Sequence, residues 1–200
     1  MWAISRALDD EDALRRAWRD ASPFPHLVLD DFVPAEALDP LLEVLDEEPL
    51  EPYAADIYTF EASRPEPRTP GVATIRDSFA EAVAPRLSRI TGRSVRRADM
   101  RVYAYEAGHY LLPHSDHQDG VGRALAYALY LPSPNAPTGG ELELFRCELA
   151  AGELVRAESA ALVEPRPNRL VVFEVGDASL HQVREVLSGV RISLSGWLYP

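Results

Sequence analysis

The sequence is poor in cysteine and contains no long apolar run. The single cysteine, Cys147, cannot form an intramolecular disulfide, which excludes a disulfide-stabilised secreted scaffold and favours a reducing, cytoplasmic location. No uninterrupted apolar segment approaches the roughly 20 residues of a membrane-spanning helix. The N-terminal residues also become acidic before an apolar signal region can form. We therefore expect no membrane partner.

Basic residues are also scarce relative to acidic ones. The 200 residues include 20 Lys and Arg against 32 Asp and Glu, which gives a net charge of −12. Such a surface repels phosphate backbones, so we expect no nucleic-acid partner. The cluster Arg93, Arg96, Arg97 and Arg101 is interpreted as a solvated face that at most attracts an anionic substrate. The sequence leaves the oligomeric state open.

Length and pattern predict one domain, 1–200, with two differently built parts. Residues 1–97 are expected to be mainly helical support with early strands, and 98–200 to be a strand-rich core. Helices are predicted over 9–19, from Pro34 onward, and along an apolar stripe from Ile75 to Ile90 that ends at Gly92. The proline-rich segment 63–71 is predicted to lack regular structure. Strands are predicted over 26–33, 56–60, 101–105, 124–131, 141–145, 160–164, 170–175, 181–186 and 190–198. Helices followed by short strands indicate an α+β fold with helices packed on a jelly-roll-like core.

One stretch carries residues suited to metal chemistry. His114 and Asp116 are two positions apart, and on an extended strand this spacing places both side chains on one face about 6.5 Å apart. His181 begins a later predicted strand and offers a second imidazole. Two histidines and one carboxylate on one face of a metal leave its other positions open, which suits non-haem Fe(II).

Two ambiguities accompany this interpretation. His117 and Asp119 have the same spacing, but they lie closer to a turn and we interpret them as loop or pocket-rim residues. Arg191 lies on one face of an apolar strand together with Ser193. A buried guanidinium needs an anionic partner, so Arg191 either binds an anionic ligand or pairs with an internal carboxylate such as Glu174 or Glu185.

The ordered motifs of the second half resemble the prolyl-hydroxylase-like branch of the Fe(II)/2-oxoglutarate-dependent dioxygenases. The matching pieces are Tyr105, Gly108 to Asp116, Tyr127 to Leu131, Gly139 to Phe145, Val163 to Pro165, Arg169 to Phe173, His181 to Val183, and Gly189 to Ser193 with Trp197. The resemblance covers roughly residues 98–198, with a weaker match at Phe24 to Phe32. The family's usual Tyr-Leu-Asn triplet reads Tyr130-Leu-Pro132 here, which leaves the polar contacts at this point open.

The resemblance implies a double-stranded β-helix in which His114, Asp116 and His181 bind iron. It further implies that Arg191 anchors the distal carboxylate of 2-oxoglutarate, and that Tyr130 and Tyr105 line the same pocket. Ser193, on the strand face of Arg191, is assigned to that co-substrate site as well. The implied cofactors are Fe(II), 2-oxoglutarate and O2, with ascorbate as a candidate reductant.

The implied activity is hydroxylation of an unactivated C–H bond, with a prolyl or other residue of a peptide or protein as the leading substrate. A free amino acid or small biosynthetic intermediate is the alternative. Two rivals of other classes are a zinc hydrolase with the same ligands and a metal-free binding module. The absence of an obvious general-base glutamate near the ligands argues against the hydrolase. Relatives place a mobile loop at about the position of 63–71, which makes this segment a candidate lid.

Overall fold

Three helices precede most of the strands in the computed structural model, which describes residues 2–200. A short 3-10 turn, η1 (Arg6–Leu8), is followed by α1 (Glu11–Asp20), α2 (Ala35–Asp46) and α3 (Pro70–Thr91). The Asp10 carboxylate accepts a hydrogen bond from the backbone N–H of Ala13 and so caps α1. Gly92, with a φ of 73°, ends α3 in the left-handed conformation that favours glycine. All three predicted helices are confirmed within a few residues.

The carboxylate of Glu48 fixes the beginning of α3. Glu48 is buried, and its oxygens accept hydrogen bonds from the backbone N–H groups of Arg68 and Thr69 and from the Thr69 hydroxyl. Burial alone would raise the pKa of Glu48, but these hydrogen bonds hold it below its ordinary value. The segment 63–71 is therefore only partly irregular, because Pro70 already occupies the first turn of α3.

Fourteen strands account for the rest of the regular structure described between residues 2 and 200. They are β1 (His26–Leu29), β2 (Glu51–Ala55), β3 (Tyr58–Ala62), β4 (Arg97–Ala98), β5 (Arg101–Tyr105), β6 (Tyr110–His114), β7 (Leu125–Leu131), β8 (Thr138–Gly139), β9 (Leu142–Ala150), β10 (Glu153–Val163), β11 (Leu170–Glu174), β12 (His181–Val183), β13 (Val186–Ser188) and β14 (Arg191–Tyr199). Every pairing between them is antiparallel.

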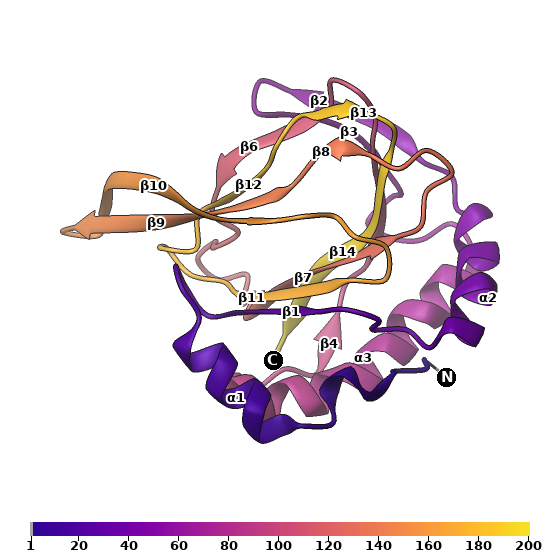
Figure 1. Ribbon diagram of the computed structural model, residues 1–200, viewed down its shortest axis with the longest axis horizontal. Coiled ribbons are helices and arrows are strands. Elements are labelled where there is room, and N and C mark those ends of the chain that lie inside the picture. The colour runs from indigo at the N-terminus through magenta and orange to yellow at the C-terminus, as the bar shows by residue number, and fades with distance from the viewer. Residues whose placement is uncertain (1) are drawn as a thin grey trace.

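Twelve strands form one curled sheet in the order β1-β11-β7-β14-β5-β3-β6-β12-β9-β10, with β2 on β3 and β4 on β14. The curl places β6, β12 and β9 across from β7, β11 and β14, while α1 and α3 pack under the latter group (Figure 1). The main apolar cluster lies between those helices and the sheet, and includes Phe79 and Leu87 of α3 with Leu129 and Leu194 of the sheet. The α+β prediction is therefore confirmed.

Three strand predictions were wrong in extent. The expected strands 141–145 and 160–164 are the inner ends of one long hairpin, β9–β10, which projects from the body of the molecule (Figure 1). The expected strand 181–186 is divided into β12 and β13, which belong to different sheets. Among the described residues, no helix is long and apolar enough to cross a membrane.

Candidate metal centre

His114 and His181 face each other across two neighbouring strands. His114 ends β6 and His181 begins β12, and the two residues are direct antiparallel partners whose ring centroids lie 4.3 Å apart. Further along the same pair, Val183 is the partner of Leu111, so three steps on β6 match two steps on β12. This β-bulge carries one extra residue on β6 and aims both Leu111 and His114 toward the interior, although strict alternation would separate them.

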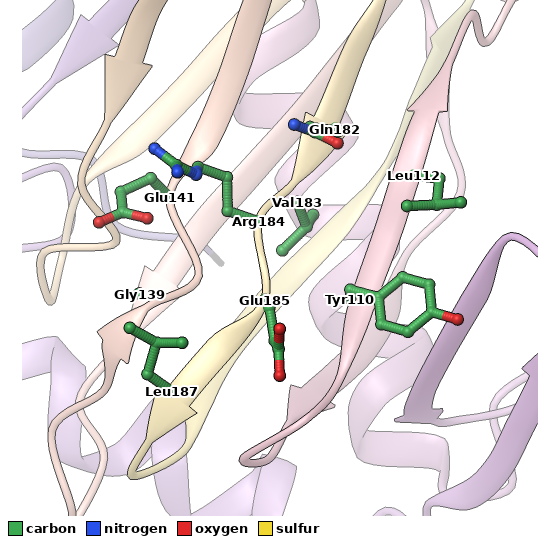
Figure 2. Close-up of a pocket in the computed structure, with 9 residues that line it drawn as sticks. All are labelled: Tyr110, Leu112, Gly139, Glu141, Gln182, Val183, Arg184, Glu185 and Leu187. Atoms are coloured by element: carbon green, nitrogen blue, oxygen red, sulfur yellow. The ribbon is translucent and has the colours of Figure 1, made fainter.

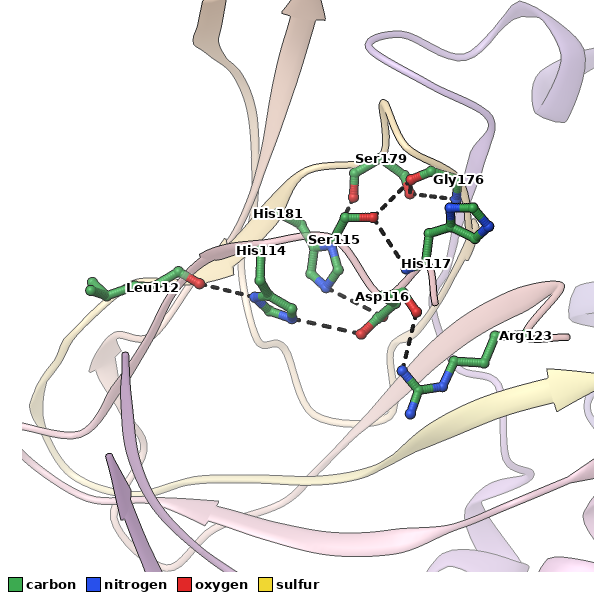
Figure 3. A network of polar contacts seen from close by, with 9 residues as sticks. All are labelled: Leu112, His114, Ser115, Asp116, His117, Arg123, Gly176, Ser179 and His181. Carbon is green, nitrogen blue, oxygen red and sulfur yellow. Dashed lines mark hydrogen bonds and ion pairs between the residues drawn. The ribbon is translucent and has the colours of Figure 1, made fainter. Parts of the chain in front are cut away.

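Asp116 completes the group from a loop. It lies two residues beyond the end of β6, so the prediction that it shares a strand face with His114 was wrong. Its Oδ1 is 3.7 Å from Nε2 of His114, and its Oδ2 is 3.5 Å from Nε2 of His181. The three ligand atoms lie within 4.8 Å of one another, and Asp116 and His181 are buried (Figure 3).

Backbone carbonyls set the tautomer of both rings. Nδ1 of His114 lies 2.9 Å from the carbonyl oxygen of Leu112, and Nδ1 of His181 lies 2.9 Å from that of Ser179. A carbonyl oxygen only accepts, so each Nδ1 carries the proton and each Nε2 presents a lone pair toward Asp116. Burial also holds the pKa of His181 below its ordinary value, against the opposing effect of Asp116. Two neutral imidazoles and a carboxylate match the donor set that Fe(II) accepts.

The competing pair His117 and Asp119 does not join this group. His117 directs Nδ1 to the carboxylate of Asp177, and the side chain of Asp119 is fully exposed. Both lie in the irregular segment that follows β6, and neither belongs to the group formed with His181. The register of β6 against β12, with His114 opposite His181, decides between the two motifs.

Arg191 lies buried in a cluster of polar residues on the same curled sheet. It begins β14, where its backbone partner is Tyr105 of β5, and two residues later Ser193 is the partner of Tyr130 of β7. The guanidinium carbon lies 4.9 Å from the ring centroid of Tyr105 and 4.8 Å from that of Tyr130. All four residues are buried, and burial raises the pKa of Tyr105, so its hydroxyl is neutral.

Two atoms of this cluster have no partner in the described part of the chain. They are Nε of Arg191 and the hydroxyl of Tyr130, both fully buried. Neither internal carboxylate considered for Arg191 pairs with it, since Glu174 pairs with Arg93 and Glu185 forms no ion pair among residues 2–200. Buried donors without acceptors are costly, and their position indicates a site for an anionic ligand.

The absence of a side chain at Gly140 leaves space for the side chain of Arg191. Its φ is 70°, and a Cβ added there would lie 2.9 Å from Cγ2 of Val186 and 3.1 Å from Cδ of Arg191. A side chain at this position would therefore strain the backbone and displace the arginine.

A profile of the 2OG-Fe(II) oxygenase superfamily matches residues 100–199, which contain all of these site residues. The chain belongs to the 2OG-Fe(II) oxygenase superfamily. Among curated relatives, the prolyl 3-hydroxylase OGFOD1 of Mus musculus is 34% identical over 193 residues, covering 90% of this chain and 33% of the relative. The protein of the same name from Xenopus laevis is 31% identical over 209 residues, covering 94% of this chain and 40% of the relative. The chain thus spans 33–40% of the length of these relatives.

Solved structures show the same fold at lower identity. A prolyl-4-hydroxylase from Pseudomonas putida superposes with a TM-score of 0.68 at 22% identity, covering 93% of this chain and 98% of that one. A prolyl hydroxylase from Trichoplax adhaerens, solved with a hypoxia inducible factor peptide, gives a TM-score of 0.71 at 14% identity, covering 97% and 90%. The predicted double-stranded β-helix with supporting N-terminal helices is confirmed.

Membership establishes an Fe(II)- and 2-oxoglutarate-dependent dioxygenase that uses O2. The residues present fit these groups. The two imidazoles and the Asp116 carboxylate fit Fe(II), and the unpartnered Arg191 Nε and Tyr130 hydroxyl fit the distal carboxylate of the 2-oxo acid. The zinc hydrolase and the metal-free binding module are thereby set aside.

Arg123 was not predicted to be a site residue, and the prediction that Arg101 belongs to a solvated face was wrong. Arg123 donates a hydrogen bond from Nη1 to the backbone carbonyl of Asp116 at 3.1 Å (Figure 3), and its guanidinium lies 3.6 Å from the ring centroid of Trp197. Arg101 is half-buried between Tyr53 and Tyr103, at 4.7 and 5.2 Å from their ring centroids, and so does not belong to a solvated face. Strand alternation places Arg101, Tyr103 and Tyr105 on one face of β5. This pattern in the sequence could have identified Arg101 as an inner-face residue.

A groove lies along the two strands that carry the histidines. Its volume is about 560 Å³, and it is lined by Tyr110 and Leu112 of β6 and by Gln182, Arg184 and Leu187 from β12 to β13 (Figure 2). None of the three metal-ligand residues lines it. Tyr110 and Leu112 alternate with Leu111, and Gln182 alternates with His181, so the groove lies on the outer face of these strands, opposite the face that carries the metal ligands.

Proposed function

We propose that this oxygenase hydroxylates a prolyl residue in a peptide or protein. The observation that carries the proposal is the 34% identity to a prolyl 3-hydroxylase, which extends over 90% of this chain.

Each part of the site has a definite task in this reaction. His114, Asp116 and His181 hold the metal from one side and leave its other side open to co-substrates. Arg191 and Tyr130 bind and orient the 2-oxo acid through its distal carboxylate. The buried rings of Tyr105 and Tyr130 exclude water from that carboxylate, which strengthens its attraction to the guanidinium. With Fe(II) and O2, the 2-oxo acid supplies the oxidant for the C–H bond and is converted to succinate and CO2.

The setting of the enzyme is part of the proposal. We place it in a reducing, cytoplasmic compartment, supported by a single cysteine in 200 residues. Such a compartment keeps iron in the ferrous state. Ascorbate is the auxiliary reductant we propose for iron that becomes oxidised without substrate turnover.

The test uses purified protein with Fe(II), 2-oxoglutarate and a library of proline-containing peptides. We expect succinate to form in equal amount to a peptide product that has gained one oxygen atom on proline. The matched peptides with alanine in place of proline should give neither, and His114→Ala should be inactive on both sets. Turnover of free L-proline without turnover of any peptide would overturn the proposal in favour of an amino-acid hydroxylase.

A further inference from the structure

Two connections between the layers of the curled sheet meet beside the metal centre (Figure 3). One runs from β6 to β7 and carries Asp116, and the other runs from β11 to β12 and ends at His181. Residues 115–118 belong to no strand, so the hydrogen bonds of the sheet do not fix the position of Asp116. Its position depends instead on contacts that this loop makes with other parts of the chain.

Ser115 lies between the ligands His114 and Asp116 and links the first connection to the second. Its hydroxyl donates a hydrogen bond to the carbonyl oxygen of Gly176 at 2.9 Å and accepts one from the backbone N–H of His117 at 3.2 Å (Figure 3). The first bond joins the two connections, and the second closes a local turn around Asp116. One hydroxyl thus holds both the shape of the ligand loop and its place beside the second connection.

The carbonyl group of Gly176 is itself held by a turn at residues 176–179. It accepts hydrogen bonds from the backbone N–H of Ser179 at 3.1 Å and from the Ser179 hydroxyl at 2.7 Å. The same hydroxyl accepts a hydrogen bond from the backbone N–H of Gly176 at 2.8 Å. Ser179 is buried, and hydrogen bonds are stronger away from water. Ser115 therefore donates to an acceptor whose position is fixed.

Ser179 also orients the histidine on the second connection. Its backbone carbonyl accepts the proton on Nδ1 of His181 at 2.9 Å, which aims Nε2 of that ring at Asp116. The turn thus sets the ring of His181 through Ser179 and holds the loop of Asp116 through Gly176. The distance of 3.5 Å between Asp116 Oδ2 and His181 Nε2 depends on both contacts.

His117 makes a second link between the same two connections. Its Nδ1 contacts the carboxylate of Asp177, so the neighbours of Asp116 on both sides, Ser115 and His117, reach the turn 176–179. The side chains of His117 and Asp177 are exposed, and exposed ion pairs contribute little. The hydroxyl of Ser115 is therefore the main link.

We propose that Ser115 and Ser179 are positioning residues for the metal centre and act together through the carbonyl group of Gly176. Their side chains are not metal ligands, but they fix Asp116 relative to His181 before the metal binds. A ligand set that is already ordered loses less conformational entropy on binding, so the two hydroxyls raise the affinity for the metal. The inference depends on the three ligands and not on which substrate is hydroxylated.

The test measures metal binding by the folded, metal-free protein. Mn(II) is titrated under nitrogen into the wild type, Ser115→Ala, Ser115→Thr, Ser179→Ala and the double alanine variant, and electron paramagnetic resonance follows the free Mn(II). The visible spectrum of the Co(II)-loaded protein reports the ligand geometry separately. Ser133→Ala is the matched control, because the Ser133 hydroxyl also donates to a carbonyl oxygen within a loop, that of Asn135 at 3.1 Å.

We expect Ser115→Ala and Ser179→Ala each to raise the Kd for Mn(II) about tenfold, the lower end of the effect of losing an outer partner of a metal ligand. Ser115→Thr keeps a hydroxyl and should bind Mn(II) nearly as the wild type does. The double variant should lose less affinity than the product of the two single losses, because both hydroxyls act through one carbonyl group. The Co(II) spectrum should change in the alanine variants at 115 and 179, whereas Ser133→Ala should keep both the affinity and the spectrum.

A purely structural role of the two serines predicts a different result. Urea unfolding of the metal-free variants would then show lower stability while the Mn(II) affinity and the Co(II) spectrum stayed unchanged, and this would overturn the inference. Equal losses of affinity in Ser115→Ala and Ser115→Thr, or in Ser115→Ala and Ser133→Ala, would overturn it too, as would losses that simply multiply in the double variant. If Ser179→Ala does not fold, the three variants at 115 and 133 decide alone. Peptide hydroxylation is not measured, so the outcome is independent of the proposed function.

Discussion

The two buried tyrosines of β7, Tyr127 and Tyr130, are expected to affect stability in opposite directions when their hydroxyls are removed. Tyr130 has a buried hydroxyl with no partner in the described chain, whereas the hydroxyl of Tyr127 donates to the backbone carbonyl of Asp99 at 2.7 Å. A buried hydroxyl without a partner costs about 1–3 kcal/mol, while a satisfied hydrogen bond contributes about 1 kcal/mol. The same Tyr-to-Phe change should therefore raise the stability of one variant and lower that of the other.

We expect Tyr130→Phe to raise the free energy of unfolding of the ligand-free protein by about 1 kcal/mol, or the Tm by about 2–4 °C. Tyr127→Phe should lower it by a similar amount. Tyr130→Phe should also weaken 2-oxoglutarate binding about 10–100-fold, because the bond it removes has a charged acceptor. Binding by Tyr127→Phe should be unchanged.

Urea unfolding without ligand gives the stabilities, and anaerobic calorimetric titration of the Mn(II)-loaded protein gives the 2-oxoglutarate affinities. If Tyr130→Phe destabilises the ligand-free protein as Tyr127→Phe does and leaves the affinity unchanged, the assignment of Tyr130 to the co-substrate site is wrong.

Three further changes test other parts of the structure. His114→Ala should abolish the weak visible band that Fe(II) and 2-oxoglutarate give anaerobically, while His117→Ala should retain it; the reverse result would move the metal to the other motif. Glu48→Gln should flatten the loss of stability in acid. The pKa of Glu48 is lowered in the folded state, so its contribution is present above about pH 4.3 and is lost as the pH falls through the folded value. Urea unfolding at pH 6 and pH 3 should show a smaller difference for the variant than for the wild type. Gly140→Ala should weaken 2-oxoglutarate binding as well as stability. Gly152→Ala, with a φ of 86° and open space around its Cβ position, should lower stability alone, and equal affinities in the two variants would contradict the crowding argument.

The local elements were largely predictable because their signals are local. The apolar stripe of α3 and the glycine that ends it depend on residues within a few positions of one another. The outer half of β9–β10 carries no such signal. Its residues from Arg146 to Ser159 are mostly exposed and charged or small, and only pairing with each other makes them strands.

The candidate metal ligands were named from the sequence because the ordered motifs around them resemble those of a known family, but their geometry depends on long-range pairing. That His114 is the partner of His181 is a matter of register between strands far apart in the chain. The arrival of Asp116 from a loop, and the stacking of Arg101 between Tyr53 and Tyr103, also arise only when distant strands meet. Such contacts cannot be predicted from the periodicity of residues within a single segment.

The extra residue in β6 allows two side chains that are three positions apart to face the interior of the sheet. Leu111, before the bulge, belongs to the apolar cluster with Val183, and His114, after it, belongs to the metal centre. Because the two are three residues apart, a β6 of this length without the bulge would turn one of them outward. The bulge therefore determines that both side chains lie on the inner face.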